Sequence, residues 1–360
     1  MQARITDAYF LQFIFIGIYM TESVKVAVLG GGSFGTAIAN IAAENGHQVF
    51  QWMRNEEAVE EILVTRQNQR YMPDYHLHEN LIPTTDLEQT VTDAVVVFVA
   101  IPSKSFRSVV SQIKPFINDS QFFVSTTKGI ETDSFKLMSQ IIQEELVTDQ
   151  VGVLSGPNLA KEIAKRHLTA SVIASNNQEK CQLIQSLLGN DYFRVYASQD
   201  NYGVELGGAL KNIYAIVSGL AAALGLGENT KSMLITRSLA EMSRFAVQLG
   251  ADPMTFLGLS GVGDLIVTCM SPLSRNYRVG YAIGQGKNLE QAVDELGEVA
   301  EGINTLKIVY DKAEEMDVYM PLVSGLYQVL YEGATVKDVA RGLMLGAHKQ
   351  DVEFAIKEGE

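Results

Sequence analysis

The chain has 360 residues, 47% of them hydrophobic, so it is long enough to bury a large core and to form two domains. Its 28 lysines and arginines against 42 aspartates and glutamates give a net charge of −14. The sequence shows no basic stripe of the kind that would indicate a nucleic-acid partner. Cys181 and Cys269 are the only cysteines, which indicates neither a disulfide framework nor a metal site and fits a reducing, cytoplasmic compartment.

The first twenty residues precede the first predicted element. Their apolar run, Leu11 to Tyr19, is too short to span a bilayer and has neither a basic block before it nor a small-residue cleavage site. Met20 leads almost directly into the first strand. We therefore expect residues 1–20 to be an extension that is not translated in the cell; an amphipathic anchor is the alternative.

A strand predicted over 24–29 runs directly into the sequence GGGSFG, a G-x-G-x-x-G motif, and a helix is predicted over 36–45. Gly30 permits the tight turn, Gly32 lets the backbone approach a pyrophosphate, and Gly35 lets helix and strand pack closely. The phosphates would bind the free N–H groups at the start of the helix. This context predicts a dinucleotide site.

The second strand, predicted over 47–53, ends without the acidic residue that usually binds the ribose 2′-hydroxyl of NAD and is followed by Arg54. A guanidinium pairs well with a 2′-phosphate, so NADP is favoured over NAD. The alternative is that Arg54 is a solvated loop residue paired with Glu56 or Glu57.

Strand and helix patterns alternate up to about residue 200, and none of the later segments reads as a strand. This predicts an N-terminal Rossmann-like, doubly wound, mostly parallel sheet followed by an all-helical C-terminal domain, with ligands at the carboxyl ends of the strands. The further strands are expected over 94–100, 122–126, 151–154, 169–174 and 192–196. The domains are expected at 21–202 (dinucleotide-binding) and 203–350 (substrate and catalysis), with a C-terminal tail at 351–360.

Lys211 and Asn212 lie in an otherwise apolar helical pattern that begins near residue 203. Burial or a nearby cation lowers the pKa of a lysine toward neutrality, which suits general acid/base chemistry. Lys128, after the expected strand at 122–126, could supply that cation. The alternative is a helix lysine whose ammonium reaches solvent.

The segment 261–277 combines glycines with short polar groups. Ser274, Arg275 and Asn276 together resemble a phosphate cradle, and Asp264 could bind a substrate hydroxyl or the ammonium of Lys211. The alternative is an ordinary surface loop.

Five sequences together resemble the bacterial NAD(P)-dependent glycerol-3-phosphate dehydrogenases, over residues 24 to about 345. They are GGGSFGTA (30–37), TKG (127–129), LSGP (154–157), GGALKN (207–212) and the string GDL to SRN (263–276). The resemblance implies a helical domain like that of 6-phosphogluconate dehydrogenase and the reversible reduction of dihydroxyacetone phosphate to sn-glycerol 3-phosphate. It also implies a supply role in phospholipid synthesis and feedback inhibition by product.

Residue roles follow from the resemblance at the matching positions. Lys211 would be the proton donor and acceptor, with Lys128 and Asp264 as further catalytic residues. Substrate would contact Lys128, Gly156, Asn158, Lys211, Asn212, Asp264, Ser274, Arg275 and Asn276. NADP, or NAD, would contact Gly30, Gly32, Ser33, Phe34, Gly35, Arg54, Tyr71, Lys128, Ala160, Arg275, Val299 and Glu301.

One position departs from the family, which usually has Ser or Thr where this chain has Asn158; an amide can still donate a hydrogen bond. Another β-hydroxyacid dehydrogenase or a non-enzymatic NAD(P) sensor remains an alternative function. We expect a cytoplasmic homodimer without nucleic-acid partners or stable membrane insertion.

Overall fold

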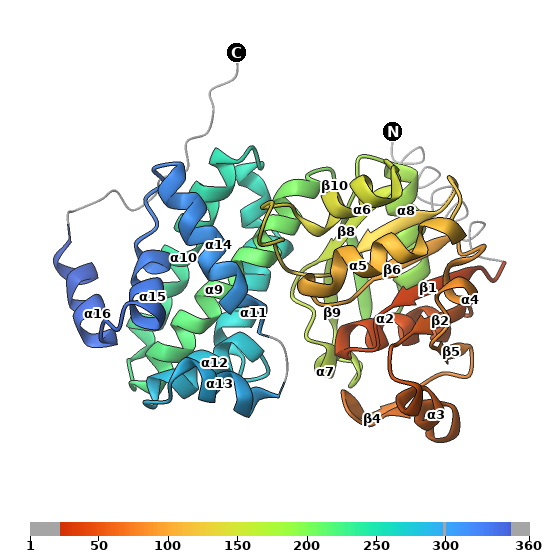
Figure 1. Cartoon of the computed structure of the whole chain (residues 1–360), viewed down its shortest axis with the longest axis horizontal. Coiled ribbons are helices and arrows are strands. Elements are labelled where there is room, and N and C mark those ends of the chain that lie inside the picture. The colour runs from red at the N-terminus through yellow and green to blue at the C-terminus, as the bar shows by residue number, and fades with distance from the viewer. Residues whose placement is uncertain (1–21, 298–299, 347–360) are drawn as a thin grey trace, which may run out of the picture.

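A computed structural model describes residues 22–297 and 300–346 (Figure 1). The predicted extension at 1–20, the tail at 351–360 and Val299 lie outside the described residues. The described chain forms a half built on a β-sheet and a half built of helices, which lie side by side. The expected fold class, a Rossmann-like sheet followed by a helical domain, is confirmed.

The sheet has eight strands in the spatial order β10-β9-β8-β7-β6-β1-β2-β5. Each neighbouring pair is parallel except β8 and β9, which run antiparallel, so the expected mostly parallel sheet is present. The strands are β1 (Lys25–Leu29), β2 (Gln48–Trp52), β5 (Leu81–Thr84), β6 (Val96–Val99), β7 (Phe122–Ser125), β8 (Val151–Ser155), β9 (Thr169–Ala174) and β10 (Phe193–Ser198).

Alternate side chains of the strands enter two separate cores, because successive residues of a strand point to opposite faces of the sheet. Val26 and Val28 of β1 pack with α2, α3 and α8, whereas Ala27 and Leu29 pack with α4, α5 and α6. The strands are therefore apolar on both faces, as buried parallel strands are. The helices of this half are α2 (Ser33–Glu44), α3 (Glu56–Thr65), α4 (Leu87–Val91), α5 (Ser103–Ile113), η1 (Lys114–Phe116), α6 (Met138–Leu146), α7 (Ala160–Ile163) and α8 (Gln178–Leu188).

Three short strands were not expected from the sequence. β3 (Gln67–Asn68) and β4 (Met72–His76) pair as an antiparallel hairpin, and β5 forms one edge of the main sheet. β4 contains Pro73 and β5 contains Pro83, and proline is typical of edge strands because it cannot donate to a ladder. These prolines and the short lengths remove the usual strand pattern.

The helical half surrounds one central helix, α9. An 18-residue window of α9 is apolar enough to cross a membrane by composition, yet 83% of that window is buried inside the protein, as expected of a core helix. A Cβ on Gly280 of α12 would lie only 2.0 Å from the carbonyl oxygen of Ile216 on α9, so glycine permits the close contact of these two helices. The described elements are α9 (Asn201–Ala223), α10 (Glu228–Gln248), η2 (Pro253–Leu257), the π-helical turn η3 (Leu259–Gly263), α11 (Asp264–Met270), α12 (Arg275–Gly284), α13 (Leu289–Leu296), α14 (Glu301–Glu315), α15 (Pro321–Tyr331) and α16 (Val336–Leu345).

Candidate active site

The glycine-rich turn joins β1 to α2 as the motif predicts. Gly30 has φ +126°, and a Cβ there would lie 2.3 Å from the carbonyl oxygen of Ala100, so only glycine fits. A Cβ on Gly35 would lie 2.4 Å from the carbonyl oxygen of Gly30. Gly32 is the N-cap of α2 and makes no side-chain hydrogen bond, and a Cβ built on it would have no atom within 4 Å. The first N–H groups of the helix, at Ser33 and Phe34, are therefore available to a pyrophosphate.

Lys128 lies after β7, at the same edge of the sheet as the glycine-rich turn, because β1, β6, β7 and β8 are parallel neighbours. Its ammonium donates to the carbonyl oxygen of Gly156 at 3.2 Å and to Oδ1 of Asn158 at 3.1 Å. It also forms an ion pair with Oδ2 of Asp264 at 2.7 Å. The lysine therefore joins the sheet edge to the helical half.

Lys211 reaches the same carboxylate from α9. Its ammonium donates to Oδ1 of Asp264 and to the hydroxyl of Thr268 at 2.7 Å. The side chains of Lys211 and Asp264 are 7% and 1% exposed, so the amine is not a surface lysine. Thr268 was missing from the predicted site; it lies four residues after Asp264 on one helix, and that spacing is the signal that places both side chains on one face.

The electrostatic setting of Lys211 suits proton transfer near neutrality. The pKa of its ammonium is lowered to about 7. Burial is the largest cause and the second cation, Lys128, also lowers the pKa, whereas the adjacent carboxylate of Asp264 raises it in part. A group with this pKa supplies both a proton donor and an acceptor at pH 7.

A chain of buried amides connects Lys128 to the helical half. Asn212 donates to the carbonyl oxygen of Lys128 at 3.3 Å, and its Oδ1 accepts from Asn276 at 2.9 Å. Oδ1 of Asn276 accepts from the backbone N–H of Gly302 at 3.0 Å. Asn212 and Asn276, two of the three amides predicted to bind substrate, are thus held in position by the protein.

The remaining residues of the predicted phosphate cradle lie at the start of α12. Ser274 is the N-cap of this helix, and its hydroxyl accepts from the backbone N–H of Tyr277 at 3.3 Å. Arg275 is the first residue of α12 and is exposed. The buried serine hydroxyl therefore shapes the helix start, and the arginine that follows it is exposed at the surface.

Glu301, at the start of α14, crosses to the Rossmann half. Its carboxylate accepts from the backbone N–H of Ser103 at 3.0 Å and from the Ser103 hydroxyl at 2.6 Å. Ser103 begins α5, so the carboxylate occupies the favourable end of that helix dipole. Ser103 was not predicted, because its partner is 198 residues away in the sequence.

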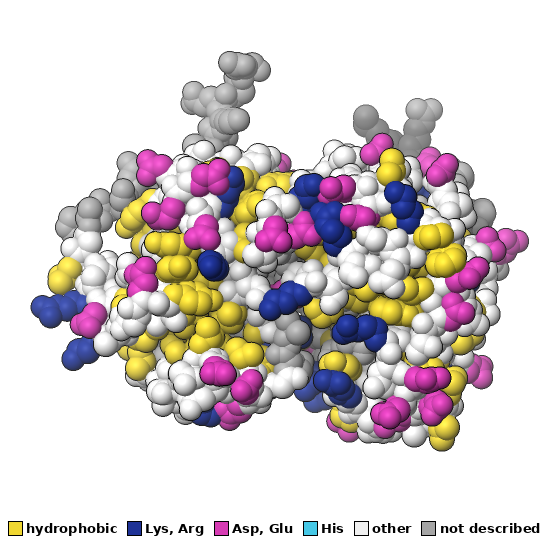
Figure 2. All heavy atoms as spheres, in the orientation of Figure 1, with side chains coloured by type: hydrophobic (Ala, Val, Ile, Leu, Met, Phe, Trp, Pro, Cys, Tyr) yellow, Lys and Arg dark blue, Asp and Glu magenta, His cyan; other side chains and the backbone are white. Residues whose placement is uncertain are grey.

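The other predicted cofactor residues lie around the glycine-rich turn. Arg54 follows β2 and is exposed, and it forms no ion pair within 22–297 and 300–346, so the alternative of a pair with Glu56 or Glu57 is not observed. Tyr71 lies in the β3–β4 turn, where its carbonyl oxygen accepts from the Ser33 hydroxyl at 3.4 Å. Ala160 begins α7. On the face shown in Figure 2, lysine and arginine side chains gather near the junction of the two halves, although the chain as a whole is acidic.

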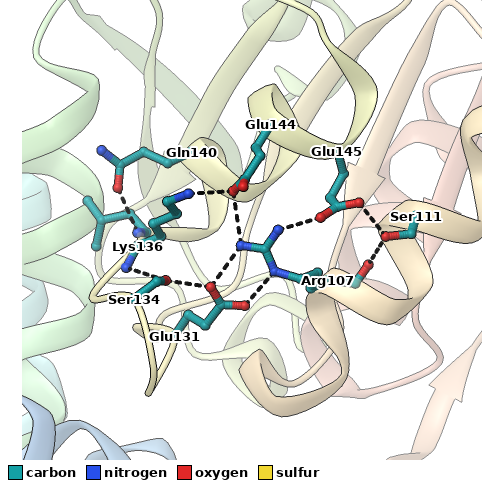
Figure 3. Close-up of polar contacts among 9 residues, drawn as sticks. Arg107, Ser111, Glu131, Ser134, Lys136, Gln140, Glu144 and Glu145 are labelled. Carbon is teal, nitrogen blue, oxygen red and sulfur yellow. Dashed lines mark hydrogen bonds and ion pairs between the residues drawn. The ribbon is translucent and has the colours of Figure 1, made fainter.

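An ion-pair network fixes the loop between β7 and α6, residues 126–137, which contains Lys128 (Figure 3). Arg107 of α5 pairs with Glu131 at 2.7 Å, with Glu144 at 3.0 Å and with Glu145. Hydrogen bonds from Arg107 lower the pKa of Glu131 to about 2. The arginine thus holds the loop and α6 against α5, which orients the backbone on which Lys128 is placed.

The fold, its glycine-rich turn and the buried cluster of Lys211, Asp264 and Lys128 at the carboxyl edge of the sheet together define the class of dinucleotide-dependent oxidoreductases. The chain matches the model of the NAD-dependent glycerol-3-phosphate dehydrogenase N-terminus over residues 25–181 and that of its C-terminus over residues 200–341. The chain therefore belongs to the NAD-dependent glycerol-3-phosphate dehydrogenase family.

Individual relatives of the chain belong to the same family. The chain is 59% identical over 335 residues to the NAD(P)+ glycerol-3-phosphate dehydrogenase of Teredinibacter turnerae, covering 93% of this chain and 98% of the relative. It is 59% identical over 340 residues to that of Azotobacter vinelandii, covering 94% and 100%. The crystal structure of a glycerol-3-phosphate dehydrogenase from Coxiella burnetii superposes with a TM-score of 0.85 at 35% identity, covering 90% of this chain and 99% of that one. The chain is thus an NAD(P)-dependent enzyme and not a cofactor sensor.

Proposed function

We propose that Lys211 is the proton donor and acceptor in the reaction of this enzyme, the reversible NAD(P)H-dependent reduction of dihydroxyacetone phosphate to sn-glycerol 3-phosphate. The observation that carries the proposal is the buried Lys211 ammonium, which contacts Asp264 and Thr268 and has a pKa of about 7. A ketone reduction requires one proton at the carbonyl oxygen, and such an amine can deliver it.

The glycine-rich turn fits a dinucleotide, because Gly32 leaves both space and unpaired N–H groups where a pyrophosphate would lie. We assign cofactor contacts to the residues around that turn and at the junction of the halves: Gly30, Gly32, Ser33, Phe34, Gly35, Arg54, Tyr71, Lys128, Ala160, Arg275, Val299 and Glu301. The bound nicotinamide supplies the hydride that reaches C2 of the substrate, or accepts it in the reverse direction. Arg54 favours NADP because its guanidinium would pair with the 2′-phosphate of that cofactor.

The protein handles the proton and the developing charge. As C2 receives hydride, the Lys211 ammonium donates its proton to the carbonyl oxygen and becomes a neutral amine. The ammonium of Lys128 stabilises the negative charge that grows on that oxygen, and Asp264 keeps both amines in place. In the reverse direction the neutral amine of Lys211 removes the hydroxyl proton.

The substrate phosphate would bind at the start of α12. Arg275 supplies a guanidinium there, and the positive end of a helix dipole favours an anion at the same place. Asn212 and Asn276 hold this helix start against Lys128, while Gly156 and Asn158 bound the site from the sheet edge. This arrangement keeps the C2 carbonyl within reach of both lysines.

Initial rates test the proposal, with dihydroxyacetone phosphate reduction followed at the nicotinamide absorbance and NADPH and NADH in parallel. We expect turnover with a preference for NADPH, and a loss of kcat of about 10²- to 10⁴-fold in Lys211→Met. Lys231→Met, which changes a partly exposed lysine on α10, is the matched control and should leave kcat unchanged. A Lys211→Met enzyme that keeps its kcat and loses only affinity contradicts the proton-transfer role; a preference for NADH contradicts the role of Arg54.

We further propose that the chain divides into domains at about residue 202 and acts as a cytoplasmic homodimer that supplies phospholipid synthesis under feedback by its product. Exposed large apolar side chains support a partner surface on the helical half, among them Met254, Leu257, Ile266, Met270 and Leu273. Hydrophobic side chains are also plentiful on the helical half in Figure 2. Sedimentation should show a dimer that Met270→Glu weakens and that Val147→Glu, a change at a more exposed position on the Rossmann half, does not weaken.

A further inference from the structure

The β3–β4 hairpin packs against the glycine-rich turn. The side-chain amide of Asn68 donates to the carbonyl oxygen of Gly31 and to the hydroxyl of Thr36, both at 2.9 Å. Tyr71 lies three residues after Asn68 in the hairpin turn, and its carbonyl oxygen accepts from the Ser33 hydroxyl at 3.4 Å. The turn that contains Arg70 is therefore fixed beside the start of α2.

The end of β2 meets the same turn from another direction. The backbone N–H of Gly30 donates to the carbonyl oxygen of Trp52 at 2.9 Å, and a Cβ on Gly31 would lie 2.6 Å from the Cε of Met53. Arg54 is the next residue. In Rossmann folds the ribose 2′-position lies at the end of the second strand, so the 2′-phosphate of NADP would lie near Arg54. Arg54 directly follows Met53, and Arg70 lies two residues after Asn68. Each arginine is thus close in sequence to a side chain that lies against Gly31.

Three arginines of this region are used differently. Arg66 donates to the carbonyl oxygens of Leu77 at 3.3 Å, Leu81 at 2.9 Å and His78, so it holds the base of the hairpin together. Arg54 and Arg70 are exposed, and neither forms an ion pair with any residue that the structure describes.

The Arg70 guanidinium has a preferred orientation. Its Cζ lies 5.2 Å from the centre of the Tyr71 ring, which is a cation–π contact. The Tyr71 carbonyl oxygen in turn accepts a hydrogen bond from the Ser33 hydroxyl. An arginine held in this way loses less conformational freedom when it binds a ligand than a free one does. A dianionic phosphate between two guanidiniums is the ligand that such a pair suits best.

We propose that Arg70 binds the 2′-phosphate of NADPH together with Arg54 and so increases the discrimination against NADH. The proposal rests on the cofactor preference proposed above. It assigns a specificity role to a hairpin whose strands are short and whose sequence carries no dinucleotide motif.

Binding measurements test it without turnover. Adenosine 2′,5′-bisphosphate and adenosine 5′-monophosphate differ only in the 2′-phosphate, and calorimetry measures their dissociation constants for the wild type, Arg54→Ala and Arg70→Ala. The single tryptophan of the chain, Trp52, lies two residues before Arg54 and offers fluorescence as a second readout. Dissociation constants of NADPH and NADH complete the set.

We expect Arg70→Ala to weaken the bisphosphate and NADPH by about tenfold while the monophosphate and NADH change by less than about twofold. The effect on the bisphosphate should shrink at high salt, because a charge pair is screened. Arg194→Ala is the matched control: Arg194 also stacks on a neighbouring tyrosine, Tyr196 at 5.1 Å, but on β10 at the opposite side of the sheet.

Other outcomes separate the two proposals. If the wild type binds the bisphosphate no better than the monophosphate, the proposed preference for NADP is wrong. If Arg54→Ala abolishes the difference and Arg70→Ala leaves it intact, the preference stands and the role of Arg70 is wrong. Equal weakening of all four ligands in both Arg70→Ala and Arg70→Gln would mean that Arg70 supports the hairpin and does not recognise phosphate.

Discussion

The carboxylate of Asp264 pairs with the ammonium of Lys211 where both side chains are almost completely buried. Because water does not screen this pair, changes in either partner act strongly on the other. The carboxylate's second oxygen binds Lys128, so one group sets the position and the proton affinity of two amines.

The pH dependence of the reaction should report Lys211. With a pKa of about 7, the ammonium needed for ketone reduction is lost as pH rises, so kcat for reduction should fall about tenfold per pH unit well above pH 7. The reverse reaction needs the neutral amine, so its kcat should rise with pH and level off above about pH 8. Rates in both directions between pH 6 and 9 check this; parallel profiles in the two directions would contradict it.

Two substitutions should shift that profile in opposite directions. Asp264 raises the pKa of Lys211 and Lys128 lowers it, so Asp264→Asn should move the reduction profile to lower pH and Lys128→Met should move it to higher pH. Both variants should lose activity, because in the proposed mechanism Lys128 stabilises the charge on the reacting oxygen and Asp264 holds both amines in place. Thr268→Val, which removes an uncharged hydroxyl that accepts from the Lys211 ammonium at 2.7 Å, should shift the profile less. Shifts of one sign in both charged variants would show that charge does not cause them.

The contact between Glu301 and Ser103 should stabilise the packing of the two halves against each other. Ser103→Ala removes the hydroxyl donor at 2.6 Å and should cost about 1–2 kcal/mol of unfolding free energy. Chemical denaturation measures this loss, with Ser108→Ala, an exposed position on the same helix, as the control. No difference between the two variants would mean that Glu301 does not hold α5 in solution.

Glu205 should make stability depend on pH. It lies on α9, and its carboxyl accepts from the backbone N–H of Ser139 at 3.0 Å and from the Ser139 hydroxyl. Burial raises its pKa from 4.5 to about 7. The folded state therefore binds the proton more tightly than the unfolded state, and the free energy of unfolding should fall as pH rises from about 4.5 through 7, by on the order of 3 kcal/mol in total.

Unfolding in urea between pH 5 and 8 tests the role of Glu205. Glu205→Gln should reduce the slope of stability against pH, while Glu228→Gln, whose side chain is 80% exposed, should not. Part of the slope should remain, because burial also raises the pKa of Glu241 to about 8. An unchanged slope in Glu205→Gln would mean that the carboxyl is ionised in the folded protein.

Much of the Rossmann half could be predicted because its signals are local. The apolar run before Gly30 and the glycine spacing define β1, the turn and α2 within some twenty residues. The β3–β4 hairpin was missed for the same reason: its strands are two and five residues long and interrupted by Pro73, and Asn68 and Arg66 hold it through contacts that no local pattern shows.

The sequence by itself determined the dinucleotide turn, the order of sheet and helices, and Lys211 as a polar residue in an apolar helix, because these depend on residue type and periodicity. Only the tertiary structure decided which groups meet. Asp264 lies 53 residues from Lys211 and 136 from Lys128, and Glu301 lies 198 from Ser103. The Lys211–Asp264 pair forms when α11 packs on α9, and the other two pairs form when the helical half packs on the sheet half. The burial of Lys211 in this packing brings its pKa to about 7.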